Sequence, residues 1–493
     1  MVTLIHATYI VAHNGSSHCI LRDGVVVWED DRIIHVGDTY SRHVDREIDA
    51  EGKLVCPGLI NVHALASTSV TILRLDGSMS ALDVSRDYAV EGKGSLDLVG
   101  EDLMTASRFA WANLLQGGAT TSVVITPMAM SRWESPREQS EVLARTAGEM
   151  GARAYVSHQF RSAVKYLTAQ GEPRYVWDEE AGEAGLRHAI EFCESNEGTY
   201  DDRVRTMLFP YQFETCSPAL LRAVKGANRA GGYPIHMHVA QSLHEFHESL
   251  RRYGKTPVHY LYDIEFLSPS VITTHVLYTS YNPLSGFRRG DASDIEMLAK
   301  SGATVAHCPV LYSRGVRGEG MLRSFGVYQS HGVNITLGTD TFPMDMIREM
   351  NMAAIMGKMA DVDSNAVTAR DVFDAATTNA ARALGRNDLG KIALGAKADL
   401  LIVDMTKLRL SLADDPIKTL VYMGSQGDID TVLVDGREVV QGGRIPGLDE
   451  KHLAQTANAL NQKQKRMFAA QHPMENRDDR LFPASYPPWE ASA

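Results

Sequence analysis

Polar and ionisable side chains recur at one kind of place in this sequence, the end of a β-branched, strand-like run. They are Asn61 and His63 in PGLINVH, His236 and His238 in PIHMHVA, His275 in VITTH, His307 in VAHCP and Asp340 in LGTD. Imidazole and carboxylate groups are ligands that zinc and other divalent first-row metals prefer. A lone core histidine is usually a hydrogen-bonded structural residue, but this succession, closed by an aspartate, predicts a metal-dependent catalyst.

These strand ends need a scaffold that brings them together. Between residues 57 and 389 helical and strand-like stretches alternate around glycine stops, as at Gly117-Gly118 in the segment 103–125. The strands of a parallel barrel all end at one mouth, where catalytic side chains gather. We therefore predict an α/β fold, a distorted (β/α)8 TIM barrel over 57–389.

The two ends of the chain resemble each other and differ from this middle part. Residues 1–56 and 390–446 alternate short β-branched runs with turns, among them Asp435-Gly436, a strong hairpin signal. Neither segment is large enough to bury a face alone, so we predict one small β-sandwich domain built from both chain ends. Residues 447–493 are expected to form a C-terminal helix and a tail that contacts a neighbouring subunit, which implies a homo-oligomer.

Composition limits the classes of partner. The chain has 493 residues and a net charge of -12, with no basic block, so nucleic acid is not expected as a partner, whereas a small-molecule substrate is. The five cysteines are scattered and form no C-x-x-C pair, which predicts a reducing, cytoplasmic setting without disulfides. No uncharged apolar run of about 18 residues is present, so we expect no membrane association.

Together, the motifs PGLINxH, HxHVA, TTHV, AHCPV and LGTD resemble those of the amidohydrolase superfamily of metal-dependent hydrolases, and the resemblance covers nearly the whole chain. It implies that His63, His238 and Asp340 hold one divalent metal ion, with Asp340 also carrying protons. Zn²⁺ is the expected metal, and Fe²⁺, Mn²⁺ and Co²⁺ are the alternatives.

Three further histidines match positions of the same pattern. The resemblance implies that His275 binds the metal or its water and acts in catalysis. It places His236 and His307 as pocket or supporting groups.

The sequence departs from the family pattern at the first strand. The usual His-x-His pair is replaced, with Leu65 at the place of the second histidine and Asn61 two residues before His63. An amide oxygen can bind a divalent ion, and Asn61 lies on the same strand face as His63, so an Asn-x-His metal site is one interpretation. The other is that Asn61 forms hydrogen bonds at the barrel rim.

A second departure is Gln241. Deaminases of the family carry glutamate there, which shuttles a proton to the ring nitrogen and the leaving group. Glutamine can donate a hydrogen bond but cannot exchange protons at neutral pH, so a catalytic Gln241 is restricted to that weaker role.

Both departures resemble the phenylurea hydrolases and the related thiocarbamate (molinate) hydrolase. This resemblance implies hydrolysis of an amide-like C–N or C–S bond in an N-substituted urea, thiocarbamate or anilide, with a metal-activated hydroxide as nucleophile. Two alternatives stay open: an aminohydrolase of a nucleobase-like or triazine ring, and a metal-free pseudoenzyme.

Apolar side chains follow two of the strand ends. Tyr312 comes after the His307 strand, and Phe342 and Met344 come after Asp340. We predict that these three residues line an apolar substrate pocket, the alternative being ordinary core positions.

Overall fold

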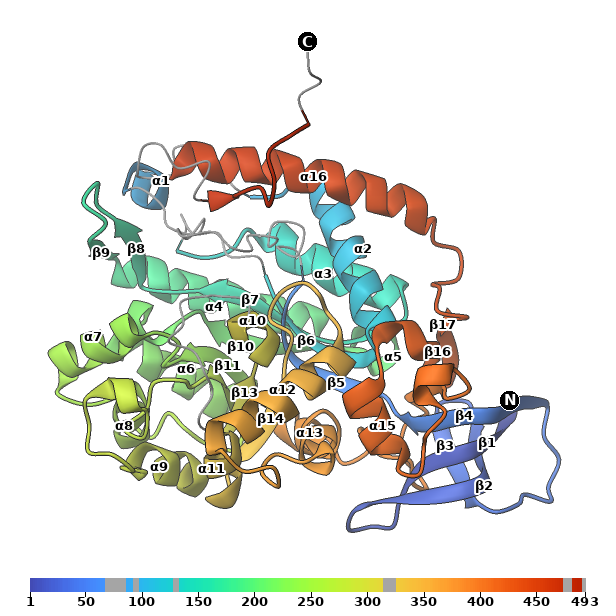
Figure 1. Ribbon diagram of the computed structural model, residues 1–493. Coiled ribbons are helices and arrows are strands. Elements are labelled where there is room, and N and C mark those ends of the chain that lie inside the picture. Colours follow the sequence, from blue (N-terminus) through green and yellow to red (C-terminus); the bar gives the residue numbers. More distant parts are fainter. Residues whose placement is uncertain (67–85, 92–96, 127–132, 314–324, 473–480, 490–493) are drawn as a thin grey trace.

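The computed structural model describes residues 1–66, 86–91, 97–126, 133–313, 325–472 and 481–489. Its centre is a parallel sheet of eight strands in the order β14-β13-β12-β11-β10-β7-β6-β5 (Figure 1). The strands are β5 (Leu59–Leu65), β6 (Ala119–Ile125), β7 (Arg153–Phe160), β10 (Val204–Pro210), β11 (Ile235–Val239), β12 (Val271–His275), β13 (Thr304–His307) and β14 (Asn334–Leu337).

The first and last of these strands meet. Ala64 at the end of β5 forms a parallel bridge with Asp340, just beyond β14. The sheet is therefore a nearly closed barrel, and the predicted (β/α)8 fold is confirmed.

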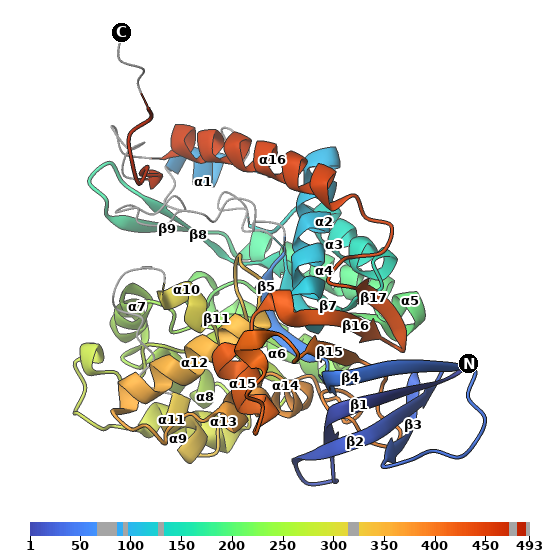
Figure 2. The ribbon, with the colours of Figure 1, turned by 45° about the vertical axis from the view of Figure 1, so that its right-hand side comes forward.

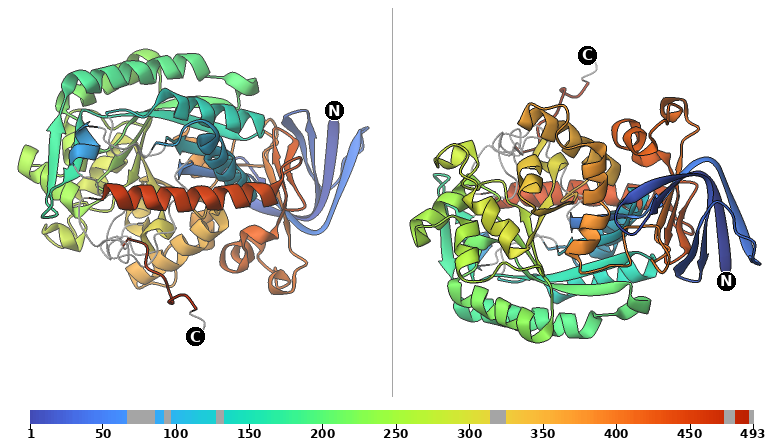
Figure 3. Two further views of the ribbon diagram at one scale, coloured as in Figure 1. Left: turned by 90° about the horizontal axis from the view of Figure 1, so that it is seen from above. Right: turned by 90° about the horizontal axis from the view of Figure 1, so that it is seen from below.

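Helices surround the barrel, as the view from below in Figure 3 shows. They include α2 (Gly100–Gln116), α3 (Arg137–Glu149), α4 (Glu179–Asn196), α6 (Pro218–Gly231), α7 (Leu243–Tyr253), α8 (Pro257–Asp263), α9 (Ser293–Ser301), α10 (Pro309–Ser313), α11 (Phe325–Ser330), α12 (Met346–Asp361), α13 (Ala369–Ala375) and α14 (Thr378–Ala383). Capping residues in the sequence determine where these helices begin and end. In α6 the Ser217 side chain accepts from the Leu220 amide, Pro218 occupies the first turn, and Gly232 ends the helix in the left-handed conformation.

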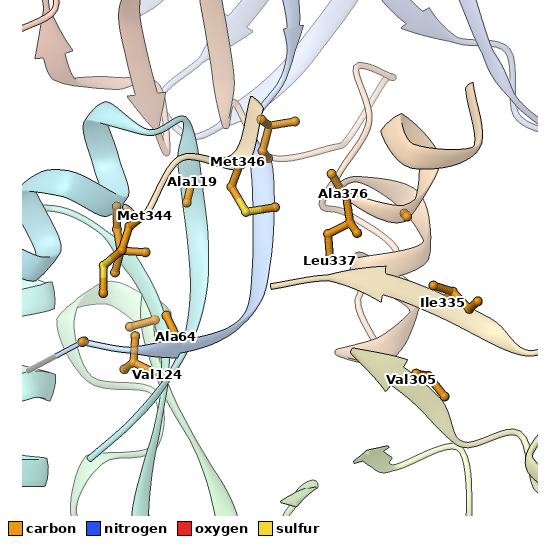
Figure 4. Close-up of a cluster of buried hydrophobic side chains, with 14 of the residues drawn as sticks. Ala64, Ala119, Val124, Val305, Ile335, Leu337, Met344, Met346 and Ala376 are labelled. Atoms are coloured by element: carbon orange, nitrogen blue, oxygen red, sulfur yellow. The ribbon is translucent and has the colours of Figure 1, made fainter. Parts of the chain in front are cut away.

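Two hydrophobic layers hold these elements together. Outside the barrel, Val305, Ile335 and Leu337 belong to a large core that also contains Met344 and Met346 (Figure 4). Inside the barrel, a smaller cluster combines Ile60, Val62, Val123, Tyr155, Met207, Ile272 and Ala306 with residues of α14. The interior is thus filled by side chains below the strand ends and leaves the strand ends for polar groups.

Strands from both chain ends form a second sheet, in the order β17-β16-β15-β4-β1-β2-β3. Its members are β1 (Val2–His13), β2 (His18–Glu29), β3 (Arg32–Gly37), β4 (Arg46–Pro57), β15 (Leu400–Asp404), β16 (Ile429–Val434) and β17 (Arg437–Gln441). The junction is the antiparallel pair β4–β15. Figure 2 shows this sheet beside the barrel, next to α15 (Pro416–Met423), and the prediction of a β unit built from both ends is confirmed.

A buried ion network joins the two sheets. Arg153, at the start of β7, is 1% exposed and donates to both carboxylate oxygens of Asp399 at 2.9 and 3.2 Å and to Asp435. Lys397 lies 3.1 Å from Asp435. Arg203 lies 3.9 Å from the same carboxylate, and Lys397 also pairs with the more exposed Asp31, so each buried carboxylate has a cation beside it.

The long helix α16 (Glu450–Gln471) crosses the molecule beside α2 (Figure 1). Near its end Phe468 packs with Tyr88 of α1 (Arg86–Glu91), Val164 of β8 (Ala163–Leu167) and Leu481. The strand β8 pairs with β9 (Pro173–Trp177) in a two-stranded ribbon. None of the helices in the described part of the chain is long and apolar enough to span a bilayer.

Candidate active site

Four buried side chains from distant parts of the sequence meet at the barrel mouth. They are His63 of β5, His238 of β11, His275 of β12 and Asp340 after β14, and each offers a ligand atom within 4.8 Å of the others. Asp340 Oδ2 lies 3.2 Å from His63 Nε2 and 3.5 Å from His275 Nε2, and the Nε2 atoms of His63 and His238 are 3.3 Å apart.

Two features of the backbone position these groups: a hydrogen bond between neighbouring segments and strained φ angles. The Asp340 amide donates to the His63 carbonyl at 2.9 Å, which joins β5 to the loop after β14. His275, Asp340 and Ala240 all have positive φ, at 79°, 57° and 51°. Non-glycine residues rarely adopt this conformation, and such strain concentrates at functional sites.

Neighbouring groups orient two of the histidine rings. His238 Nδ1 donates to the Tyr211 carbonyl at 2.8 Å, so its Nε2 carries the lone pair that faces the cluster. His63 Nδ1 lies 3.1 Å from His236 Nε2, which is also 2.7 Å from the Thr274 hydroxyl. The structure thus places His236 behind His63, as a partner of its outer nitrogen.

The cluster fits a divalent metal ion. Four ligands in a tetrahedron around zinc, at the usual distance of about 2.0–2.1 Å, are separated from one another by roughly 3.3 Å. The three distances among the cluster atoms given above, 3.2, 3.3 and 3.5 Å, are close to that value. Both ring nitrogens of His275 are buried without a hydrogen-bond partner among the described residues, as expected of an imidazole that awaits a ligand.

The electrostatics of the site favour neutral imidazoles. Burial, with the nearby His63 as the second cause, lowers the pKa of His238 to about 3. Burial also lowers the pKa of His275 and of His236 well below the usual value, and neighbouring histidines lower both further. Only the neutral ring can bind a metal, so the lowered pKa values of His238 and His275 favour metal binding by these two rings.

The first-strand departure is visible in the structure. Asn61 is fully buried, and its Oδ1 accepts from the amides of His63 at 3.2 Å and Thr339 at 3.1 Å, while its Nδ2 donates to the Thr339 hydroxyl at 2.8 Å. Through these hydrogen bonds the Asn61 amide links β5 to the loop that carries Asp340. Leu65 packs with Ile125, Phe209 and Tyr211 and forms an apolar wall.

Gln241 follows the end of β11 in a loop held by a buried carboxylate. The amides of Ala240 and Gln241 donate to the two oxygens of Glu245 at 2.6 and 2.8 Å. Glu245 is fully buried, and burial with the neighbouring Glu214 raises its pKa well above the usual value. These hydrogen bonds fix the backbone at Gln241, and so the position from which its side chain projects, although the residue lies in a loop.

The predicted pocket residues have different positions. The Tyr312 ring meets His275 edge to face at 5.3 Å between ring centres, and Phe342 lies half-buried with its ring 5.9 Å from that of Phe109 on α2. His307 is 2% exposed and contacts Phe325, and its Nδ1 has no hydrogen-bond partner among the described residues. Met344 is 1% exposed and lies in the outer core (Figure 4).

Several residues that support the site escaped the sequence analysis. Tyr211 and Thr339 act through a backbone carbonyl and a hydroxyl, which leave no pattern in the sequence. Glu245 had a signal, because Ser242-x-x-Glu245 matches a capping box. In the structure Ser242 does accept from the Glu245 amide, but the carboxylate reaches Ala240 and Gln241 instead.

Comparison with known proteins agrees with this site. Residues 54–439 match the Amidohydrolase family. The 5'-deoxyadenosine deaminase of Methanosarcina mazei is 31% identical over 443 residues, 89% of this chain and 92% of that protein. The 5-methylthioadenosine/S-adenosylhomocysteine deaminase of Thermococcus onnurineus is 29% identical and covers 89% of this chain and 93% of its own.

Solved structures show the same fold. An adenosine deaminase from Xanthomonas campestris with bound zinc has a TM-score of 0.75 at 21% identity, covering 94% of this chain and 98% of its own. The atrazine chlorohydrolase of Arthrobacter aurescens, complexed with zinc, has a TM-score of 0.74 at 20% identity, covering 93% and 100%. With the family match spanning most of the sequence and the deaminase likeness extending over 89% of it, the chain belongs to the amidohydrolase family.

Proposed function

We propose that this protein is a metal-dependent aminohydrolase that removes the amino group from an adenosine-like purine. The buried group of three histidines and one aspartate supports hydrolysis at a metal centre. The similarity to 5'-deoxyadenosine deaminases over 89% of the chain carries the choice of substrate class. The expected release of ammonia differs from the amine or thiol that the first-strand motif had suggested.

The roles of the chain's own residues follow from their positions. His63, His238 and Asp340, with His275, would hold the ion, Zn²⁺ being the first choice for this donor set. A divalent ion bound there supplies a hydrolytic water that is acidic enough to react near neutral pH. Asp340 lies against two of the histidines and takes the water's proton, and the same carboxyl then delivers that proton to the departing amine.

A second candidate function rests on Gln241. An amide in place of a carboxylic acid makes protonation of a ring nitrogen harder, whereas an open-chain carbonyl needs only the proton carried by Asp340. Hydrolysis of an N-substituted urea, thiocarbamate or anilide is therefore the alternative, with an amine or thiol as the first product.

One experiment separates these reactions. Metal-replete and chelator-treated protein would be incubated with 5'-deoxyadenosine, 5'-methylthioadenosine and adenosine, and in parallel with N-aryl ureas, thiocarbamates and anilides, with products identified by mass spectrometry. We expect chelator-sensitive ammonia release from the purines. Release of aniline or thiol instead would establish the second candidate, and silence from both panels would favour the pseudoenzyme.

Substitutions tie the activity to the site. We expect Asp340→Asn to lower kcat by about 10²–10⁴-fold, the usual contribution of a proton-transferring group, without a change in the thermal unfolding midpoint. The control is His188→Gln, in a half-exposed histidine of α4 whose ring hydrogen-bonds with Glu134, and this variant should keep full turnover. A fully active Asp340→Asn variant would remove Asp340 from the mechanism.

A further inference from the structure

Gln241 leaves one chemical requirement of the reaction unmet. When hydroxide adds to an aminopurine, negative charge builds on the adjacent ring nitrogen, and a hydrogen-bond donor must lie there to stabilise it. The Gln241 amide is a weak neutral donor on a half-buried side chain. Another donor near the cluster is therefore required, and its partner must come from the substrate.

Tyr312 has the position for this role. Its helix, α10, begins two residues after β13 ends, so the chain turns back over the barrel mouth at once. The ring stands at 86° to the His275 ring with 5.3 Å between centres. This ring contact places the phenol beside one of the four cluster residues.

The hydroxyl of Tyr312 has the Gln241 side chain as a hydrogen-bonding neighbour, but it makes no hydrogen bond of normal geometry. The residue is 8% exposed, and its Oη is buried without such a bond to any described residue. Buried polar groups in folded proteins nearly always have a partner, and an exception beside a catalytic centre points to a ligand that completes it. A phenylalanine here would fill the same space and avoid the free-energy cost of the buried hydroxyl.

We propose that the Tyr312 hydroxyl donates a hydrogen bond to the substrate atom on which negative charge develops, and so replaces the acid missing at position 241. The step is stabilisation alone: the phenol keeps its proton, and Asp340 remains the carrier of the water's proton. This inference rests on the proposed aminohydrolase function, because the acceptor is the ring nitrogen of an aminopurine.

The test compares Tyr312→Phe with a matched control, Tyr155→Phe. Tyr155 is a buried tyrosine of the lower barrel interior, so both substitutions delete one phenolic oxygen and keep the ring. For Tyr312→Phe we expect kcat for 5'-deoxyadenosine to fall about 10²–10³-fold, as for the loss of a single charge-stabilising donor, with KM changed less than about threefold. Tyr155→Phe should leave both constants unchanged. Equal kcat in wild type and Tyr312→Phe would overturn the proposal, because an apolar wall needs only the ring.

A rescue variant adds a readout that a structural role would not move. Gln241→Glu in the Tyr312→Phe background should restore deamination at least tenfold, since a carboxylic acid supplies the lost donor. If both variants fold and the activity is not restored, the Tyr312 hydroxyl does not take the place of an acid at position 241, and the proposal is overturned.

A binding measurement distinguishes failure of this inference from failure of the proposed function. Calorimetry with a purine analogue that bears a tetrahedral, hydroxylated carbon at position 6 should show affinity at least tenfold lower for metal-replete Tyr312→Phe than for wild type. Equal, measurable affinities overturn the role of Tyr312 and keep the substrate class. No binding to wild type, together with urea or anilide turnover, overturns both the purine assignment and the ring-nitrogen role.

Discussion

Two buried amides in the barrel, Asn61 and Gln159, differ in how their hydrogen bonds are satisfied. Asn61 makes three, all to the segment around His63 and Thr339. Gln159, on β7 beside Phe209 of β10, is fully buried, and neither atom of its side-chain amide has a partner in the described part of the chain. An unpaired buried group lowers stability by about 1–3 kcal/mol, whereas a paired one contributes to it.

We therefore predict opposite effects of removing the two amides. Gln159→Met should raise the free energy of unfolding by about 1 kcal/mol, and Asn61→Leu should lower it by about 2 kcal/mol, because the latter leaves the Thr339 amide unpaired. Urea unfolding of both variants beside wild type measures the difference. A destabilised Gln159→Met protein would mean that the Gln159 amide has a hydrogen-bond partner in the folded protein.

Buried histidines also predict how stability depends on pH. Burial lowers the pKa of His307 to about 3, against about 6.5 in an unfolded chain. Between these values the unfolded chain binds more protons than the folded one, so stability must fall as the pH drops below about 6.5.

For metal-free protein we expect urea midpoints to decrease steadily from pH 7 to pH 4.5, and the decrease to be smaller in His307→Gln. The control is His43→Gln, in a side chain that is 87% exposed, which should follow the wild-type curve. A flat profile in wild type would show that the buried rings are already protonated in the folded state.

At the scale of elements, closure of the barrel depends on Gly338. A Cβ atom added there would lie 2.8 Å from His63 Cβ and 2.9 Å from its carbonyl oxygen, too close for any side chain. Gly338→Ala should therefore push β14 away from β5, lower the free energy of unfolding by about 1–3 kcal/mol and weaken metal binding, measured by chelator competition.

The matched control for Gly338→Ala is Gly226→Ala on α6, where an added Cβ meets nothing within 4 Å. This variant should be slightly more stable than wild type, because alanine is the better helix former. Equal behaviour of the two variants would show that the approach of β14 to β5 is looser than the structure has it.

The elements themselves were largely predictable from sequence, since strand ends carry a clear signal of β-branched residues followed by His or Asp. The long-range hydrogen bonds were not. The Asn61–Thr339 pair spans 278 positions, and no local pattern reports it. The position of Met344 was not predictable either. Its spacing after Asp340 does not distinguish a residue that lines the substrate pocket from one in the hydrophobic core, where Met344 lies.

In the molecule as a whole, Arg153 is a buried connection between the barrel and the terminal sheet. Arg153→Met should lower the free energy of unfolding by about 3–5 kcal/mol, because Asp399 loses its buried counter-charge and Asp435 keeps only Lys397 and Arg203 among the described cations. Differential scanning calorimetry and limited proteolysis would detect the loss and any earlier melting of the terminal sheet. Arg137→Met, at a half-exposed surface pair with Glu141, should change stability by less than about 0.5 kcal/mol.

The pairing of β4 with β15 has a consequence for synthesis. Pro57 ends β4 and Leu400 begins β15, so at about 5–20 residues per second the ribosome needs on the order of 20–70 s to make the partner strand. During that time the β4 edge, with β1 already beside it, offers unpaired backbone groups to any other extended chain. The nascent protein should therefore depend on a chaperone that covers this edge until the last part of the chain emerges.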